Sequence, residues 1–177
     1  MDERARLSSD IRAALRPVPD FPVRGVLFQD ITPVLADAGL FGRVTSAMAE
    51  PWVRSSVTHV AAVESRGFML GGAVAAALGA GFVPIRKPGR LPRQAARVSY
   101  DLEYRQDVLE MHRDACPSGR VLVLDDVLAT GGTAAAACAL VEDVGGEVVG
   151  TGFLLSIRAL EGSGRLLGRR IETLVIC

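Results

Sequence analysis

The feature that most constrains the fold is the segment from Val121 to Thr133, which reads VLVLDDVLATGGT. Its four leading apolar residues are typical of a strand buried on both faces, as at the centre of a parallel sheet. Two aspartates, a short loop with Gly131 and Gly132, and an alanine-rich stretch follow. Glycines let a backbone turn several N–H groups towards one point, and a helix that begins there attracts negative charge. The segment therefore predicts a strand, an anion-binding loop and a helix, in that order.

The residues in and around this loop indicate which kind of anion it would bind. The hydroxyls of Thr130 and Thr133 would add donors for a phosphate, and no lysine lies inside the loop, so it is not a Walker A loop. Asp125 and Asp126 would repel a phosphate unless they face another group. Carboxylates accept hydrogen bonds from vicinal ribose hydroxyls, and they also bind hydrated Mg²⁺. A solvated strand end followed by a helix is the alternative interpretation.

Strand-like and helix-like segments alternate along the rest of the chain. Helices are expected at residues 3–15, 40–50 and 132–144 and in the glycine- and alanine-rich stretch after Arg66, and strands at residues 57–63, 81–85, 121–124, 147–155 and 173–177. This alternation predicts one α/β domain over residues 1–177, with an open, mostly parallel sheet flanked by helices. Such sheets bind ligands at the carboxyl ends of their strands. Residues 20–33 and 86–99 are expected to form loops.

Composition excludes several classes of protein. Hydrophobic residues make up 49% of the chain, which excludes a disordered protein, and 20 basic residues balance 20 acidic ones, which argues against a nucleic-acid-binding protein. The charged N-terminus does not resemble a signal peptide, and glycines interrupt the uncharged stretch 67–85, so no membrane span is expected. Cys116, Cys138 and Cys177 are scattered, which favours reduced thiols in the cytoplasm over a zinc site or disulfides.

Two further segments could bind anions. Arg66 follows a strand candidate and stands beside Gly67, so it can offer a guanidinium and loop amides to an anion. Arg86, Lys87 and Arg90 cluster around a Pro-Gly turn. For this second cluster the alternatives are a solvated basic loop and a nucleic-acid patch, but aromatic residues are not interleaved with it.

Residues 121–133 resemble the phosphoribosyl-diphosphate (PRPP) motif of type I phosphoribosyltransferases. The resemblance implies that Ala129, Thr130, Gly131, Gly132 and Thr133 hold the 5-phosphate and that Asp125 and Asp126 contact the ribose hydroxyls. It also implies pyrophosphate contacts from Ser65, Arg66, Arg86, Lys87 and Arg90, with a non-proline cis peptide between Ser65 and Arg66. The run RKPGRLP at residues 86–92 is similar to the R-K-x-G-K-L-P stretch of adenine phosphoribosyltransferases, with Arg90 in place of lysine.

Residues 20–33 carry the resemblance that concerns the base. Their pattern is similar to the signature D-[FY]-P-x-x-G-[VI]-x-F-x-D-[IV]-[TS]-P of adenine phosphoribosyltransferases. The resemblance implies a small N-terminal hood region, residues 1–35, in which Phe28 stacks on adenine, Leu27 covers it, and backbone groups of Leu27 and Gln29 read its amino edge. Gln29 replaces the family's usual arginine or lysine. A loop that plugs its apolar residues into the core is the alternative.

Residues 99–104, SYDLEY, resemble the loop that covers the site in this family. The resemblance implies that Glu103 assists proton movement at the purine, and that Tyr100 and Tyr104 belong to the loop over the site. Arg66 is expected to be catalytic as well, through charge neutralisation on pyrophosphate. Arg105 replaces the family's usual glycine, which would alter the motion of the loop if that glycine needs a positive φ or acts as a hinge.

Taken together, the resemblance implies a Mg²⁺-dependent enzyme that converts adenine and PRPP into AMP and pyrophosphate, as a homodimer in the cytoplasm. Asp125 and Asp126 could reach Mg²⁺ through water, and no direct protein ligand of the metal is expected. Gln29 and Arg105 leave open a transferase for another purine, such as guanine or xanthine. A PRPP-binding regulator without catalysis and a catalytically impaired relative also stay open.

Overall fold

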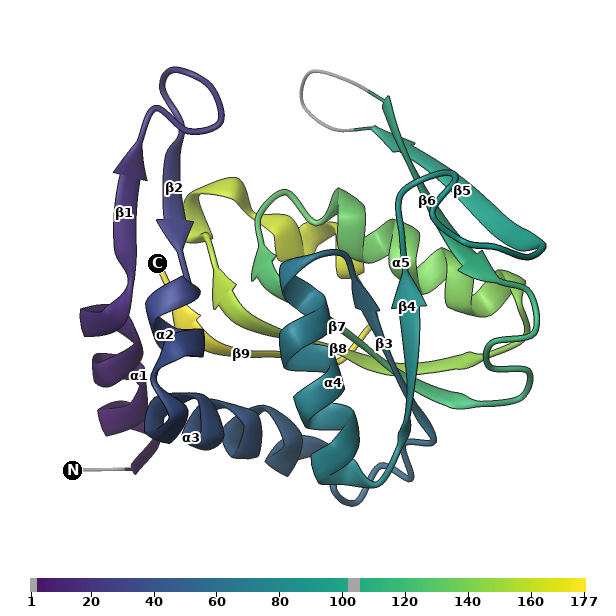
Figure 1. Cartoon of the computed structure of the whole chain (residues 1–177), viewed down its shortest axis with the longest axis horizontal. Coiled ribbons are helices and arrows are strands. Elements are labelled where there is room, and N and C mark those ends of the chain that lie inside the picture. Colours follow the sequence, from purple (N-terminus) through teal and green to yellow (C-terminus); the bar gives the residue numbers. More distant parts are fainter. Residues whose placement is uncertain (1–2, 102–105) are drawn as a thin grey trace.

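The computed structural model describes residues 3–101 and 106–177 and has a five-stranded parallel sheet at its centre (Figure 1). Its strands, in spatial order, are β4 (Gly81–Ile85), β3 (His59–Val63), β7 (Arg120–Leu128), β8 (Glu147–Ser156) and β9 (Ile171–Ile176). The strand expected to be central, β7, lies between β3 and β8. The predicted α/β architecture with an open parallel sheet is confirmed.

Helices cover both faces of this sheet. They are α1 (Glu3–Ala14), α2 (Thr32–Ala36), α3 (Ala38–Ala49), α4 (Arg66–Leu78) and α5 (Gly132–Asp143), with the short 3₁₀ segments η1 (Glu50–Trp52), η2 (Arg158–Leu160) and η3 (Gly162–Leu166). Along β7, Val121 and Val123 belong to the same core cluster as α5, whereas Leu122 and Leu124 belong to that of α4. Successive side chains of a strand point to opposite faces, which explains why the apolar run is continuous.

Two antiparallel hairpins lie outside the main sheet. β1 (Arg16–Pro19) pairs with β2 (Leu27–Asp30), and β5 (Ala95–Asp101) pairs with β6 (Gln106–His112). Figure 1 shows both hairpins rising above the same side of the molecule, one at each end. The expectation that residues 20–33 and 86–99 are entirely loops was therefore wrong. Prolines and glycines in these segments are typical of loops, but cross-strand hydrogen bonds to distant residues stabilise short strands there.

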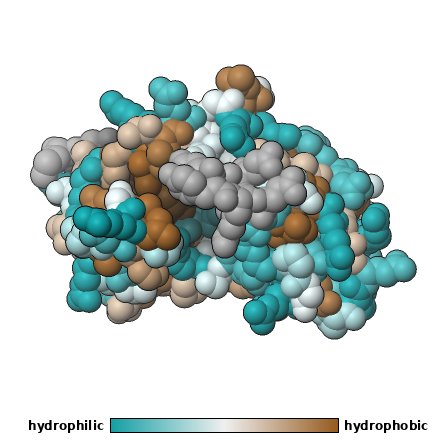
Figure 2. Space-filling view, turned by 90° about the horizontal axis from the view of Figure 1, so that it is seen from above, coloured by the Kyte–Doolittle hydropathy of each residue, from teal (hydrophilic) through white to brown (hydrophobic). Residues whose placement is uncertain are grey.

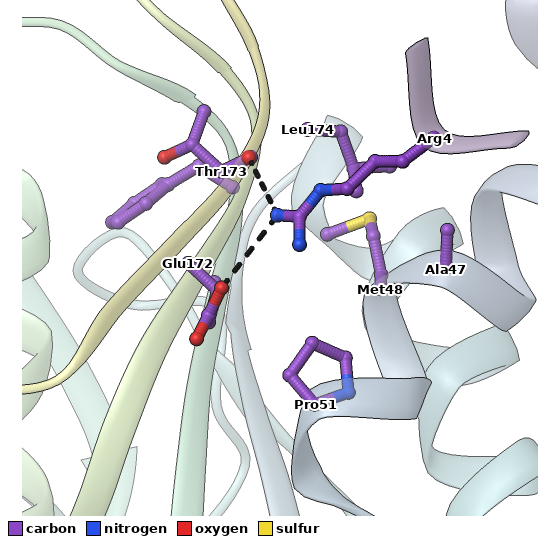
Figure 3. Close-up of a pocket in the computed structure, with 9 residues that line it drawn as sticks. Arg4, Ala47, Met48, Pro51, Glu172, Thr173 and Leu174 are labelled. Carbon is purple, nitrogen blue, oxygen red and sulfur yellow. Dashed lines mark hydrogen bonds and ion pairs between the residues drawn. The ribbon is translucent and has the colours of Figure 1, made fainter. Parts of the chain in front are cut away.

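Helix α1 packs beside the edge strand β9. The Arg4 guanidinium donates to Thr173 O at 3.4 Å and lies 3.7 Å from a carboxylate oxygen of Glu172 (Figure 3). Arg12 likewise donates to Ile176 O. These arginines satisfy carbonyls on the open edge of the sheet, so α1 covers an edge that would otherwise be exposed to other strands.

The uncharged stretch 67–85 forms helix α4 and then strand β4. Gly71 lies so close to β3 that a Cβ atom there would come within 2.5 Å of Ala62 Cβ, and Gly79 ends the helix with a φ of 64°. Within residues 3–101 and 106–177, no helix is both long enough and apolar enough to cross a membrane.

Candidate active site

Arg66 and Asp126 meet where two neighbouring strands end. Arg66 is the first residue of α4 and follows the end of β3 after a two-residue turn, and Asp126 lies near the end of β7. Because β3 and β7 pair in parallel, their carboxyl ends coincide, and Arg66 Nε lies 2.6 Å from Asp126 Oδ2. The Asp126 side chain is only 6% exposed, and the Arg66 side chain 33%. The structure thus joins the predicted pyrophosphate loop to the predicted ribose site.

The two aspartates differ in their surroundings. Asp125 Oδ1 accepts a hydrogen bond from the Asp126 N–H at 2.9 Å. Burial, and next the nearby Asp126 carboxylate, raise the pKa of Asp125 well above its usual range. Among the described residues, Asp126 Oδ2 has no hydrogen-bond partner of correct geometry despite its ion pair with Arg66. Because Arg66 occupies that oxygen, a ligand hydroxyl could donate to it only where the guanidinium moves away.

The predicted anion loop forms at the N-terminus of α5. Gly131 has a φ of 81° and precedes the helix, and in the described structure no side chain caps the first turn. The first backbone N–H groups of α5 could therefore donate to an anion, and phosphate binding at this loop stays a prediction. Thr133 Oγ1 lies 3.4 Å from the hydroxyl of Tyr100, which β5 brings over the loop.

The turn between β3 and α4 contains a cis peptide, but not at the expected bond. The cis bond joins Glu64 to Ser65, one residue before the predicted Ser65–Arg66 bond. Arg66 already belongs to α4, so the change of direction between strand and helix takes place before it. Ser65 is the N-cap residue of α4, and its side chain makes no capping hydrogen bond.

The predicted basic cluster is attached to β3 by a carboxylate. Glu64 Oε2 lies 2.8 Å from Arg86 Nε, and its Oε1 accepts from the Lys87 backbone N–H at 3.1 Å. The Arg86 guanidinium also donates to Arg90 O at 3.0 Å, while the Arg90 side chain lies on the surface. Three of the five predicted pyrophosphate contacts, Arg86, Lys87 and Arg90, therefore lie together, with Arg86 already paired.

Lys87 faces Asp107 and Tyr100. Its ammonium pairs with Asp107 Oδ2 and lies 3.3 Å from the Tyr100 hydroxyl. Burial by itself lowers the pKa of Lys87, but the hydrogen bond to Asp107 and the neighbouring Tyr100 raise the pKa above its ordinary value. Lys87 consequently carries its charge throughout the neutral pH range.

Sequence reasoning missed the role of Glu110. This β6 residue is 2% exposed, and it accepts from the Gly89 N–H at 3.0 Å and lies 2.6 Å from Arg97 Nε. Its backbone also bridges to Arg86. A buried carboxylate needs such partners, so Glu110 stabilises the basic turn at residues 86–90 through Gly89 and Arg86. The only local signal was a glutamate between the apolar residues Leu109 and Met111.

The predicted base segment lies beside this site. Phe28, on β2, stacks edge-on against Phe21 with 5.0 Å between ring centroids, and Arg66 Cζ lies 4.6 Å from the centre of its ring. Leu27 is 56% exposed, and Gln29 is half-buried and paired with Pro17. Figure 2, viewed from above, shows apolar side chains gathered beside a hollow. The exposed apolar residues of the hairpin are Val18, Phe21, Val23, Val26 and Leu27.

Tyr100 is the described member of the predicted loop over the site. Glu103 and Tyr104 lie outside the described residues, as does Arg105. Tyr100 is described and is 9% exposed, with its hydroxyl between Lys87 and Thr133. The assignments of individual site residues to substrate groups stay predictions.

Comparison with known proteins identifies the family. The family model of the phosphoribosyl transferase domain matches residues 41–165. An adenine phosphoribosyltransferase from Myxococcus xanthus is 57% identical over 170 residues, which cover 96% of this chain and 92% of that one. The chain belongs to the adenine phosphoribosyltransferase family.

Solved adenine phosphoribosyltransferases share the fold almost from end to end. The enzyme from Rhodothermus marinus superposes with a TM-score of 0.94 at 48% identity, covering 98% of this chain and 99% of that one. The Saccharomyces cerevisiae enzyme, solved with adenine and an imino-altritol bisphosphate, has a TM-score of 0.90 at 35% identity, covering 96% and 99%. The expected resemblance to type I phosphoribosyltransferases is confirmed.

Proposed function

We propose that this chain transfers the phosphoribosyl group of PRPP to adenine, forming AMP and pyrophosphate. The observation that carries the proposal is the position of Arg66, which contacts both the acidic pair at the end of β7 and the aromatic ring of the N-terminal hairpin. An anion loop, a sugar-binding carboxylate and an aromatic platform within one site match the three parts of a nucleotide. The yeast relative, solved with adenine, supports the choice of base.

The 5-phosphate is assigned to the loop Ala129–Thr133 and the ribose hydroxyls to the acidic pair. The free N–H groups at the start of α5 support the first assignment. The buried Asp126 oxygen without a hydrogen-bond partner among the described residues supports the second. A ribose hydroxyl that donates to this oxygen would compete with Arg66, so substrate binding should free the guanidinium for pyrophosphate.

In the proposed reaction, the bond between the anomeric carbon and pyrophosphate breaks as adenine N9 attacks that carbon. Negative charge accumulates on pyrophosphate, and Arg66, Arg86, Lys87 and Arg90 would neutralise it. N9 loses its proton, for which Glu103 is the predicted acceptor. Tyr100, Tyr104 and the loop that carries them would exclude the water that otherwise hydrolyses PRPP.

Mg²⁺ is the proposed cofactor. In the part of the chain that the structure describes, no three His, Cys, Asp or Glu side chains gather into a metal site. The carboxylates of Asp125 and Asp126 fit instead a hydrated ion that PRPP itself binds, because Mg²⁺ retains several waters and prefers phosphate oxygens. The metal would supply further charge neutralisation at pyrophosphate.

We also propose a homodimer in the cytoplasm. Met69 on α4 and Phe82 on β4 are 45% and 38% exposed, although both are large and apolar, which supports contact with a second copy. Cys116, Cys138 and Cys177 are all free thiols, which supports a reducing compartment. Size-exclusion chromatography with light scattering would measure the oligomeric state.

The decisive experiment measures pyrophosphate release from PRPP with adenine, guanine, hypoxanthine and xanthine supplied separately, with and without Mg²⁺. Release with adenine alone, abolished by a chelator, is expected. Release with another base would keep the mechanism and overturn the base assignment. Folded protein that binds PRPP and releases nothing would instead be a regulator or an impaired relative.

A further inference from the structure

The anion loop packs directly against a C-terminal segment to which sequence analysis assigned no role. This segment, the brace, comprises residues 161–166 and contains the 3₁₀ turn η3. A Cβ atom on Gly131 would lie 2.2 Å from Gly162 O, and a Cβ atom on Gly162 would lie 2.1 Å from Ala129 O. Contacts this short are impossible. A side chain on Gly131 would therefore displace the backbone of the brace, and a side chain on Gly162 would displace the backbone of the anion loop.

The brace is itself attached to the protein. Leu166 is 1% exposed and belongs to the core cluster that contains α5. Beyond the brace, Arg169 Nη1 lies 2.8 Å from Glu142 Oε1 on α5. Before the brace, the Ile157 N–H donates to Leu128 O at 2.9 Å, directly ahead of the anion loop. The brace therefore has anchors on both sides of the loop that it touches.

We propose that the brace positions the anion loop for the 5-phosphate, and that Gly162 is a positioning residue for phosphoribosyl binding. The inference rests on the proposed function of the Ala129–Thr133 loop. A phosphate site made of backbone N–H groups needs those groups to converge, and a misplacement of about 1 Å can lower a rate about a hundredfold. The loop's two glycines resist such displacement poorly by themselves. Backbone contact with Gly162 limits the positions that the loop can adopt.

The first test compares Gly162→Ala with Gly164→Ala. The same methyl group is added to the same segment, but a Cβ atom at Gly164 would have no described atom within 4 Å. PRPP and AMP both carry a 5-phosphate, whereas adenine and pyrophosphate do not. Gly162→Ala should raise KM for PRPP, and KM for AMP in the reverse reaction, about tenfold or more, with KM for adenine and pyrophosphate nearly unchanged. Gly164→Ala should behave as the unaltered chain.

Equal changes in all four KM values, or none, would overturn the proposal. A purely structural role for Gly162 would lower the thermal midpoint without separating the substrates that have a 5-phosphate from those that lack one. The midpoints of both variants are therefore measured alongside the kinetics.

A second test uses the unaltered chain, in case Gly162→Ala does not fold. Amide hydrogen exchange is followed by mass spectrometry with ribose 5-phosphate or adenine added. Ribose 5-phosphate should slow exchange in residues 158–166, and adenine should not. Unchanged exchange at saturating ribose 5-phosphate would overturn the proposal. This test needs no turnover, so it remains decisive even if the chain fails to use adenine.

Discussion

Arg66 Nε lies 2.6 Å from Asp126 Oδ2, and the same guanidinium lies 4.6 Å above the ring of Phe28. One side chain thus links the carboxyl end of the sheet to the N-terminal hairpin. In the proposed reaction this places Arg66 between the ribose, the base and the leaving pyrophosphate. Loss of this arginine should therefore affect more than one substrate.

Arg66→Lys should lower kcat/KM for PRPP about a hundredfold, because lysine keeps the charge but loses the planar group that pairs and stacks at the same time. Steady-state kinetics of pyrophosphate release would measure this. Arg54→Lys is the matched control, since Arg54 is exposed and precedes β3, away from the carboxyl ends of the strands. Full activity of Arg66→Lys would exclude the assigned role.

Phe28→Ala should raise KM for adenine about tenfold and leave KM for PRPP nearly unchanged, because stacking of a base on an aromatic ring contributes about 1–3 kcal/mol. Phe28→Tyr keeps the ring and should restore the affinity for adenine. Isothermal titration with adenine and PRPP provides an independent measure of both affinities. If Ala and Tyr have the same effect, the ring does not bind the base.

Glu64→Gln should weaken pyrophosphate binding, with KM for pyrophosphate in the reverse reaction rising about tenfold, because Arg86 loses a charged partner that orients it. Glu147→Gln removes a comparable glutamate–arginine pair, with Arg120, at the amino ends of β7 and β8, the end of the sheet opposite the site. That exposed pair should contribute at most about 1 kcal/mol to stability and nothing to kinetics. A similar KM for pyrophosphate in Glu64→Gln and Glu147→Gln would contradict the prediction.

Asp125→Asn should stabilise the fold at neutral pH while turnover collapses. The folded state raises the pKa of Asp125, so between its unfolded and folded pKa values the native state binds more protons than the unfolded state. Stability from this group is therefore present at low pH and lost as pH rises through the folded pKa. Each unit of pKa elevation corresponds to about 1.4 kcal/mol.

The pH dependence distinguishes this explanation from a general packing effect. Urea unfolding of Asp125→Asn and the unaltered chain would be compared across the acid-to-neutral range. The gain in the free energy of unfolding should be absent at about pH 3, below the usual pKa of aspartate, and should reach a plateau above the folded pKa. A gain in the free energy of unfolding that is constant with pH would contradict the assignment of the effect to the Asp125 carboxyl.

Gly42→Ala and Gly71→Ala should change stability in opposite directions. Both glycines lie inside helices, but a Cβ atom at Gly42 meets open space, whereas one at Gly71 would come within 2.5 Å of Ala62 Cβ. Gly42→Ala should stabilise by about 0.5–1 kcal/mol, the usual difference in helix propensity. Gly71→Ala should destabilise by about 1–3 kcal/mol through overpacking. Thermal and urea unfolding would measure both.

The sequence predicted the elements that depend on local pattern. Strand β7, the anion loop and α5 follow one another as expected, because a continuous apolar run, loop glycines and helix propensity act between near neighbours. Local pattern does not predict the hairpins. Pro17 and Pro19 are typical of a chain leaving a helix, yet they form an outer strand opposite residues 27–30. Nothing near either proline indicates that partner.

By itself, the sequence determined the fold class, the anion loop and the family resemblance, since these reside in contiguous residues. Only the tertiary structure decided which distant groups meet. It put Arg66 over Phe28, attached Glu110 to the basic turn through the Gly89 N–H, and packed Gly162 against the anion loop. Such contacts follow from strand order and register, which depend on the free energy of the whole core rather than on any local pattern.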